Sequence, residues 1–275
     1  MRRIGWLLGL LAVAWLDTAT AAAEDLQLDG RAVQGGLVLG QTVAGTRLEL
    51  DGRAVRVGED GRFVIGFGRD AEALAELAAR LPDGRILRRT LEVEARDYRI
   101  QRIDGLPPRQ VTPSEEELAR IRAEAQRIRR ARRRDSDLSG FGEAAAWPAL
   151  GPISGVFGSQ RILNGEPRSP HRGIDVAAAA GTPVGAMASG VVSLAATGMF
   201  YTGGTVIVDH GHGVHSIYAH LAEVRVGEGA QLARGDVIGT VGATGRATGP
   251  HLHWGVYWFD EALDPALLVG PMPAQ

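Results

Sequence analysis

Five Asp-Gly dipeptides recur over residues 24–105 and constrain the fold of this stretch more than any other feature; they begin at positions 29, 51, 60, 83 and 104. Asp-Gly favours the tight turn of a β-hairpin because both turn residues need a positive φ. Leu48, Leu50, Val55 and Val57 flank one of these turns at a spacing of two, which is typical of half-buried strands. The stretch therefore predicts a small β-domain built from hairpins.

This N-terminal β-domain is placed at residues 24–111. Within it we expect a short helix over residues 70–81 and a strand over residues 85–95. All seven histidines of the chain lie further on, between His171 and His253. The carboxylates of the domain fall in turns and on solvent-facing strand positions, so no catalytic cluster is evident. A regulatory or targeting role is the most that the domain indicates.

Residues 1–23 have the pattern of a secretory signal peptide. A short basic start precedes an apolar run over residues 4–16 and a small-residue stretch that ends at Ala23. The apolar run is shorter than the roughly 20 residues that a membrane-spanning helix needs, although an uncleaved anchor is the alternative. No later segment is long and apolar enough to cross a membrane. The pattern predicts a secreted chain that acts in the periplasm.

Residues 112–146 are predicted to connect two domains by a helix and a linker. Thr112 is expected to cap the helix, with Pro113 at its first position and Glu115 completing a capping box. The arginines near its end indicate a solvated helix terminus, with binding of an anionic polymer as the alternative. Residues 136–146 are poor in large apolar side chains and predict a flexible linker. The second domain then covers residues 147–275.

Two missing residue types narrow the chemistry. All 30 basic residues are arginine, so Schiff-base and P-loop chemistry, which need a lysine amine, are excluded. The chain has no cysteine, which excludes disulfides, thiol catalysis and Cys-ligated zinc. The formal net charge of −2 does not indicate a nucleic-acid-binding protein. Any metal site must therefore use histidines and carboxylates.

Two short patterns in the second domain have the spacing of a metal site. His171 and Asp175 are four residues apart, which puts both side chains on one face of an extended segment. His251 and His253 are two apart, so in a strand both imidazoles point to the same side while Leu252 faces the core. Two histidines and one carboxylate suit zinc, with a fourth position left for water. The arrangement predicts a catalytic metal site.

A third pattern adds groups for proton transfer. Tyr218 and His220 are also two residues apart, and in a strand they would share one face. The chain has no His-Glu pair of the kind that supplies a glutamate base in other zinc hydrolases. His220 and His251 are therefore the candidates for the general base, and Tyr218 is a candidate oxyanion donor.

The motifs HRGID, YAHL and GPHLHW, in this order, resemble those of the lysostaphin-like (LytM-type) zinc metallopeptidases. The resemblance covers roughly residues 151–268 and implies a small, mostly antiparallel β-fold, which makes the whole chain mainly β. It implies that His171, Asp175 and His253 bind one zinc ion per chain. It also implies that His220 and His251 flank the water.

The same resemblance implies a zinc endopeptidase that hydrolyses peptide cross-links of bacterial peptidoglycan. The peptide stems of the wall are then the binding partner, and the absence of a repeated wall-anchoring module favours a periplasmic D,D-endopeptidase. The alternative is a non-catalytic regulator with the same fold that activates a cell-wall amidase. The bond cleaved and any regulatory protein are not indicated by these residues.

The remaining histidines and two tryptophans have simpler explanations. His210 and His212 lie in a glycine-rich turn and His215 lies near the start of a strand, so all three are predicted to be structural or solvent-exposed. Trp254 and Trp258 alternate with the same period as Leu252, so they are predicted to pack in the core.

Overall fold

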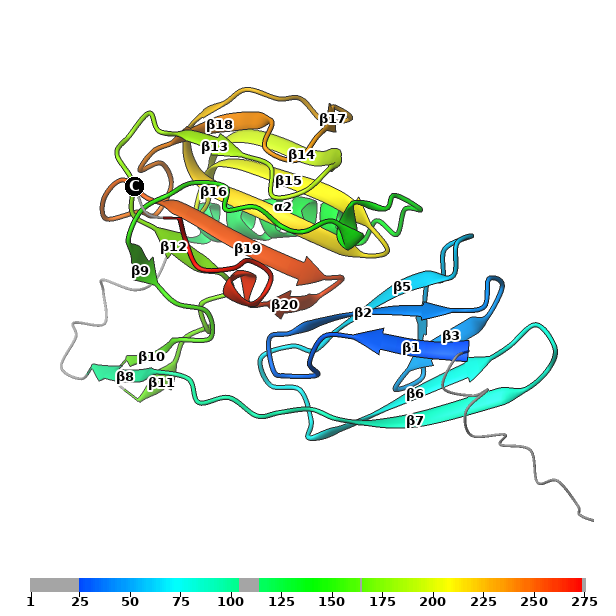
Figure 1. Ribbon diagram of the computed structural model, residues 1–275. Coiled ribbons are helices and arrows are strands. Elements are labelled where there is room, and N and C mark those ends of the chain that lie inside the picture. Colours follow the sequence, from blue (N-terminus) through cyan, green and yellow to red (C-terminus); the bar gives the residue numbers. More distant parts are fainter. Residues whose placement is uncertain (1–24, 104–113, 164, 274–275) are drawn as a thin grey trace, which may run out of the picture.

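The computed structural model describes residues 25–103, 114–163 and 165–273. The described part of the chain is mainly β, as the sequence predicts, and its strands pair almost entirely antiparallel, with a long helix packed beside them (Figure 1). The predicted signal peptide and the Asp-Gly pair at position 104 lie outside the described residues. No helix in the described part is long and apolar enough to span a membrane.

The N-terminal region consists of two antiparallel sheets. The first has the order β1-β2-β5 and the second the order β4-β3-β6-β7. Their strands are β1 (Leu26–Asp29), β2 (Leu37–Thr42), β3 (Arg47–Leu50), β4 (Arg53–Val55), β5 (Arg62–Gly66), β6 (Leu74–Arg80) and β7 (Ile86–Glu92). The Asp-Gly pairs at 51 and 83 close the β3-β4 and β6-β7 hairpins, with φ of 76° at Gly52 and 90° at Gly84. The predicted β-structure of this region is confirmed, and strand β7 lies within the predicted strand over residues 85–95.

The helix predicted over residues 70–81 is wrong, because this segment contains strand β6. Along the strand the side chains of Ala75, Leu77 and Ala79 are buried while Leu74 and Glu76 are exposed. This is the period-two pattern of a half-buried strand. Pairing with β3 on one side and β7 on the other outweighs the helix preference of alanine and leucine.

A small third sheet joins the two halves of the sequence. Strand β8 (Ile100–Ile103) runs parallel to β10 (Gln160–Leu163), which pairs antiparallel with β11 (Glu166–Pro167). Of the strand pairs described, β8 with β10 is the parallel one. Residues at the end of the predicted N-terminal domain therefore pair with the second half of the chain.

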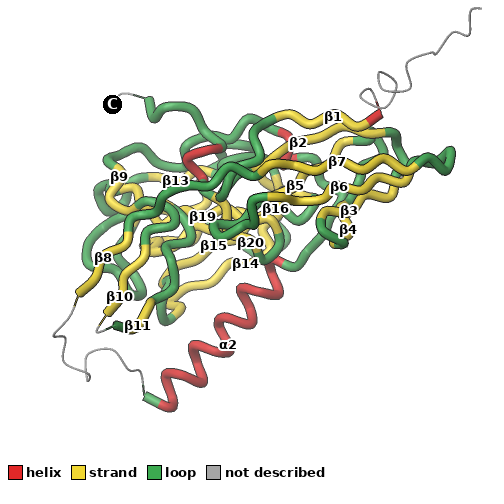
Figure 2. The backbone as a smooth tube through the Cα atoms, turned by 90° about the horizontal axis from the view of Figure 1, so that it is seen from below, coloured by secondary structure: helices red, strands yellow, loops and turns green. Residues whose placement is uncertain are grey.

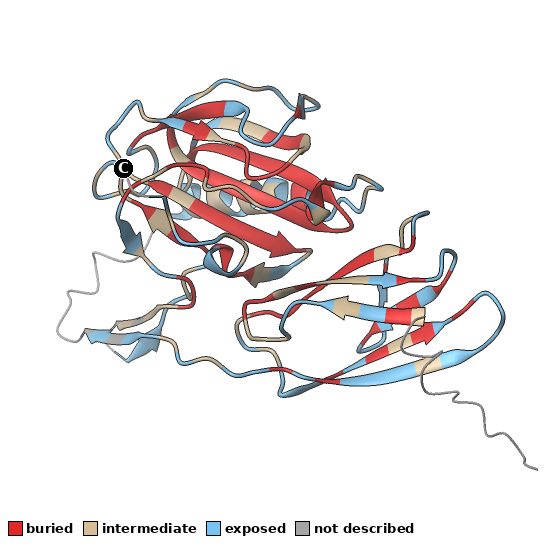
Figure 3. Ribbon diagram, in the orientation of Figure 1, coloured by how far each residue is buried: buried red, intermediate tan, exposed pale blue. Residues whose placement is uncertain are grey.

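The second half is built on a ten-stranded antiparallel sheet whose main path is β17-β14-β15-β16-β19-β12-β9. Its strands are β9 (Ile153–Gly155), β12 (Ile174–Val176), β13 (Pro183–Gly185), β14 (Gly190–Met199), β15 (Gly203–Gly211), β16 (Val214–Val224), β17 (Gln231–Leu232), β18 (Val237–Val241), β19 (Leu252–Trp258) and β20 (Glu261–Leu263). A short 3-10 turn, η3 (Pro265–Leu267), follows. Strands β15, β16 and β19 are buried along most of their length (Figure 3).

Helix α2 (Glu115–Arg132) lies across one face of this sheet, over β14 and β15 (Figure 2). The predicted helix is confirmed, but its predicted cap is wrong. Ser114 is the N-cap, and its side chain and that of Glu117 form the reciprocal capping box. The helix begins at Glu115, and Thr112 and Pro113 lie outside the described residues.

The predicted flexible linker over residues 136–146 is instead anchored on both sides. It contains a short 3-10 turn, η2 (Gly140–Gly142), and the Phe141 ring is buried 4.2 Å from that of His212. Arg62 of β5 donates a hydrogen bond to the Gly142 carbonyl at 3.3 Å and lies near the same ring. One aromatic side chain at the centre of the segment fixes it between the two regions.

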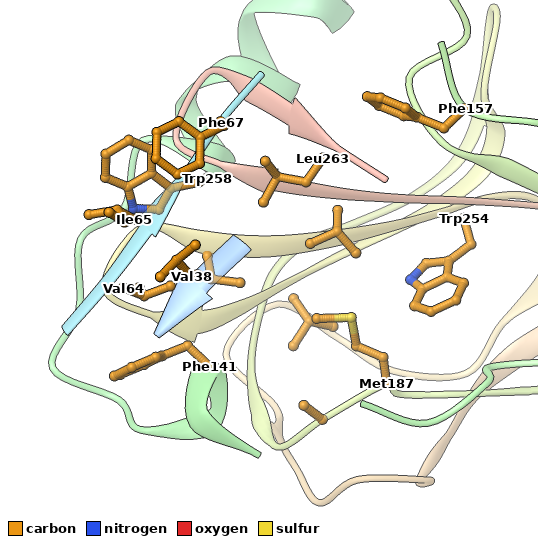
Figure 4. Close-up of a cluster of buried hydrophobic side chains, with 14 of the residues drawn as sticks. Val38, Val64, Ile65, Phe67, Phe141, Phe157, Met187, Trp254, Trp258 and Leu263 are labelled. Carbon is orange, nitrogen blue, oxygen red and sulfur yellow. The ribbon is translucent and has the colours of Figure 1, made fainter. Parts of the chain in front are cut away.

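The hydrophobic core is continuous between the N-terminal sheets and the large sheet (Figure 4). Val38 and Ile65 from the first region and Trp258 and Leu263 from the second belong to one buried cluster. Trp254 and Trp258 are both buried, which confirms their predicted packing in the core. The two regions therefore share the apolar surface that stabilises them.

Candidate metal centre

Asp175 and His253 face each other across two neighbouring strands. Asp175 is the middle residue of β12, and the antiparallel register pairs it directly with His253 of β19. Paired residues project to the same face of a sheet. The His253 Nδ1 lies 2.9 Å from the Asp175 Oδ1. Gly155 of β9 pairs with Asp175 on its other side, and a Cβ there would meet the Asp175 Oδ2 at 2.2 Å, so glycine leaves room for the carboxylate.

His171 reaches the same point from the segment before β12. Its Nε2 lies 3.1 Å from the Asp175 Oδ1 and 3.0 Å from the His253 Nδ1. Its Nδ1 lies 3.0 Å from the Val156 carbonyl oxygen. Since a carbonyl can only accept, Nδ1 carries the proton and Nε2 presents a lone pair to the centre. Two ring nitrogens and one carboxylate oxygen thus converge.

The protonation of these groups fits a divalent metal ion. Burial alone would raise the pKa of Asp175, but the hydrogen bonds and electrostatic interaction with His171 and His253 outweigh it and hold that pKa well below its usual value. Burial lowers the pKa of His253 despite its bond to Asp175. At neutral pH the carboxylate is ionised and the His253 imidazole is neutral, which is the state that metal ligands require. The three donors lie within 4.8 Å of one another.

His220 and His251 lie beside these three residues. The His220 Nδ1 donates to the Thr244 carbonyl at 2.8 Å and the His251 Nδ1 donates to the Gly249 carbonyl at 2.9 Å. The two rings are 4.7 Å apart, and the His251 Nε2 lies 4.0 Å from the Asp175 Oδ1. Burial lowers the pKa of His220. Both rings therefore have a fixed tautomer, with Nε2 able to accept a proton.

Tyr218 does not join them, so the prediction that it shares a face with His220 is wrong. The Tyr218 ring is fully buried on the opposite face of β16, and its hydroxyl accepts hydrogen bonds from the Met187 amide at 2.8 Å and the Ser216 hydroxyl at 3.0 Å. Burial raises its pKa to about 12. His220 has a φ of 63°, and this break in the extended backbone turns its side chain toward His251 and His253.

The three other histidines are buried away from the centre, as structural residues. His210 contacts the Ser189 carbonyl and the Ser216 hydroxyl, each at 2.7 Å. His215 contacts the Gly213 carbonyl at 3.1 Å, and His212 stacks on Phe141. All three are almost completely buried, which excludes the solvent-exposed alternative.

Sequence reasoning did not identify the carbonyls that orient the ring nitrogens, those of Val156, Thr244 and Gly249. A backbone oxygen leaves no signal in residue type. It also passed over Gly155. Gly173, inside the HRGID motif, is also required by close packing. A Cβ at Gly173 would lie 2.3 Å from the Trp254 carbonyl oxygen, so the backbone there packs directly on β19.

Comparison with known proteins agrees with this geometry. A sequence model described as Peptidase family M23 matches residues 169–265, which include all five converging side chains. A crystal structure of a putative peptidase M23 from Pseudomonas aeruginosa is 33% identical, and the likeness covers 88% of this chain and 96% of that chain with a TM-score of 0.67. The chain belongs to peptidase family M23. The resemblance to lysostaphin-like peptidases, and the antiparallel β-fold that it implies, are confirmed at the level of this family.

Two curated proteins each match a little over a third of the chain. DD-carboxypeptidase/endopeptidase Mpg of Neisseria meningitidis is 43% identical over 103 residues, which are 38% of this chain and 24% of that protein. Peptidoglycan DD-endopeptidase ShyA of Vibrio cholerae is 42% identical over 103 residues, which are 37% of this chain and 24% of that protein. The chain thus matches about a quarter of the length of these relatives.

Proposed function

We propose that this M23 protein is a zinc-dependent endopeptidase that hydrolyses peptide cross-links of bacterial peptidoglycan. The observation that carries the proposal is the convergence of His171 Nε2, Asp175 Oδ1 and His253 Nδ1 within 4.8 Å, beside two histidines with fixed tautomers. Two imidazoles and one carboxylate are a donor set that zinc favours in catalytic sites. In this proposal one zinc ion binds per chain.

When bound, zinc supplies Lewis acidity, which polarises a carbonyl and makes water more acidic. The chain's own residues supply the rest. Because its pKa is lowered, His220 is neutral at pH 7, and its Nε2 accepts the proton of the attacking water. His251 lies 4.7 Å from the His220 ring, with its Nε2 4.0 Å from the Asp175 Oδ1, and is the second candidate base, because its Nδ1 holds the proton that is donated to the Gly249 carbonyl and its Nε2 is free to accept one. Tyr218 takes no part.

The substrate class is supported by the names of the relatives. One is called a peptidoglycan DD-endopeptidase and another a DD-carboxypeptidase/endopeptidase. Cleavage of a D,D cross-link is therefore the proposed reaction, in remodelling of the cell wall. Since peptidoglycan lies outside the cytoplasm, the protein acts in the periplasm, as the signal-like sequence of residues 1–23 also favours. The peptide stems of the wall are the partner.

The test is to measure zinc content and digestion of purified, cross-linked peptidoglycan by the same preparation. We expect about one zinc per chain and new amino termini among the released muropeptides, with both lost in Asp175→Ala. Bound zinc without release of amino termini, together with stimulation of an added amidase, would instead support the non-catalytic regulator. Absence of zinc from the purified and zinc-supplemented protein would contradict the proposed metal centre.

A further inference from the structure

The metal ligand His171 is held by one short turn, residues 156–159. The Val156 carbonyl accepts from the His171 Nδ1 at 3.0 Å. The Gly158 amide donates to the His171 carbonyl at 2.9 Å, and the His171 amide donates to the Ser159 carbonyl at 2.8 Å. Backbone and ring of His171 are therefore both positioned by this turn. A shift of the turn would displace the Nε2 from Asp175 and His253.

Two side chains from the N-terminal part of the chain hold the turn at residues 156–159 in place. Arg69, in the connection from β5 to β6, donates from its Nε to the Gly158 carbonyl at 2.9 Å. The Tyr98 ring lies directly on Gly158, where a Cβ would be only 2.0 Å from the Tyr98 Cδ1. Gly158 has a φ of 74°, which also favours glycine. The Arg69 guanidinium lies 4.5 Å from the centre of the Tyr98 ring, so the two side chains support each other.

Phe157 ties the same turn to the N-terminal sheets. Its side chain is 4% exposed, and its ring meets the edge of the Tyr98 ring with centroids 6.1 Å apart. A Cβ at Gly35, which precedes β2, would lie 2.9 Å from the Phe157 ring. The turn is therefore packed against the N-terminal region from more than one direction.

We propose that Arg69 and Tyr98 are positioning residues for the metal ligand His171, so that the N-terminal β-region is part of the scaffold of the metal centre. This inference rests on the proposed zinc site. It assigns to the region a role different from the regulation or targeting expected from the sequence. The physical reason is that residues which orient a metal ligand control its affinity, with losses of roughly 10- to 100-fold when they are removed.

The test measures the affinity of the full chain for Zn²⁺ by competition with a chromophoric chelator. Tyr98→Ala and Arg69→Ala should each weaken zinc binding by about tenfold or more. Tyr98→Phe should bind zinc within about twofold of the original chain. The Tyr98 hydroxyl is buried and has no hydrogen-bond partner among the described residues, so the ring alone does the positioning.

Arg56→Ala is the matched control. Arg56 is another N-terminal arginine that reaches across, to Asp135, with its Nε 2.7 Å from the Asp135 Oδ1 and its guanidinium also bonded to the Asp135 carbonyl. It contacts no residue of the turn in the described contacts. Its loss weakens docking of the two regions but should leave zinc affinity within about twofold. The absorption spectrum of the Co²⁺-loaded protein gives a second readout, which should change in Tyr98→Ala and not in Arg56→Ala.

The outcomes separate this inference from the proposed function. If the original chain binds zinc and both alanine variants bind it equally well, the positioning role is overturned while the zinc site stands. If Arg56→Ala weakens zinc binding as much as Arg69→Ala does, the loss of affinity reflects general destabilisation, and the positioning role is again overturned. If the original chain binds no zinc, the proposed function and this inference fail together. Should Tyr98→Ala not fold, Arg69→Ala with the Arg56→Ala control decides.

Discussion

Two regions of the large sheet contain the same short pattern, a pair of histidines two residues apart, with opposite results. His251 and His253 both face Asp175, with ring nitrogens 4.0 Å and 2.9 Å from its Oδ1. His210 and His212 diverge: the first bonds to a carbonyl and a hydroxyl in the interior, and the second stacks on Phe141. Histidine spacing alone therefore does not make a metal site.

The backbone between the two histidines decides the difference. Leu252 begins strand β19 and is fully buried, so its neighbours project together to the other face. In the second pair the intervening residue is Gly211, with a φ of 93°, and His212 itself has a φ of 51°. These left-handed conformations turn the chain and separate the rings. Two histidines at this spacing point to the same side only where the backbone between them stays extended.

The largest expected effect distinguishes the two regions by metal binding. Asp175→Ala and His171→Ala should weaken zinc binding by more than about 100-fold, because loss of a ligand lowers the affinity more than loss of a residue that only orients a ligand. Asp175→Asn keeps the size and tests the charge. His210→Ala, from the buried pair, should keep its zinc. Equal zinc content in Asp175→Ala and the original chain would remove the distinction.

Beside the proposed ligands, His220→Ala should separate metal binding from chemistry. We expect zinc to remain bound and turnover to fall by a factor on the order of 100, the usual cost of losing a general base. Turnover on soluble cross-linked muropeptides and metal content measured on the same sample would check this. Loss of zinc from this variant would place His220 among the ligands instead.

The buried region should respond in stability. His210→Ala removes hydrogen bonds to the Ser189 carbonyl and the buried Ser216 hydroxyl; the hydroxyl keeps its bond to Tyr218, while the carbonyl loses this partner. The free energy of unfolding should fall by about 2 kcal/mol. Chemical denaturation measures it, with His220→Ala as the partly exposed comparison, for which a smaller loss is expected. An unchanged unfolding midpoint for His210→Ala would contradict a structural role for the buried histidines.

The smallest expected effect is on the pH dependence of stability. Burial lowers the pKa of His215 below its ordinary value of 6.5, so the unfolded chain takes up a proton there before the folded chain does. Stability from this group is complete above about pH 6.5 and declines as the pH falls toward the folded pKa, by about 1.4 kcal/mol per pH unit. Unfolding of metal-free protein at pH 7.5 and 5.5 should therefore show a shallower decline in His215→Gln. Parallel curves for the two proteins would exclude this linkage.

The sequence predicted the elements that follow from periodic patterns and turn residues. The β3-β4 hairpin, the strand β7 and the helix over residues 115–132 all have such patterns. It failed where tertiary contacts override local preference, as in β6, whose alanines and leucines become a strand between β3 and β7. The prediction of a flexible linker over residues 136–146 was wrong for the same reason, because Phe141 packs between regions that are distant in sequence.

For the candidate site, the spacing of residues in strands predicted side chains that do converge. These are His171, Asp175 and His253, together with His251. Period-two reasoning misplaced Tyr218, because it assumes an extended backbone that the positive φ of His220 interrupts. The orienting carbonyls, such as those of Val156 and Thr244, have no side-chain signature at all. Their roles follow from how distant segments pack, which no local pattern encodes.

The glycines where the two regions meet restrict how this protein can be recombined with its relatives. A Cβ at Gly66 of β5 would lie 2.7 Å from the Trp258 Cβ, and one at Gly35 would lie 2.9 Å from the Phe157 ring. At each of these glycines the missing side chain leaves room in the N-terminal half for a bulky aromatic residue of the other half. A chimera that joins one half to a foreign counterpart would lose this fit, even if both halves kept their folds. The N-terminal sheets and the ten-stranded sheet should thus be exchangeable between family members only as a matched pair.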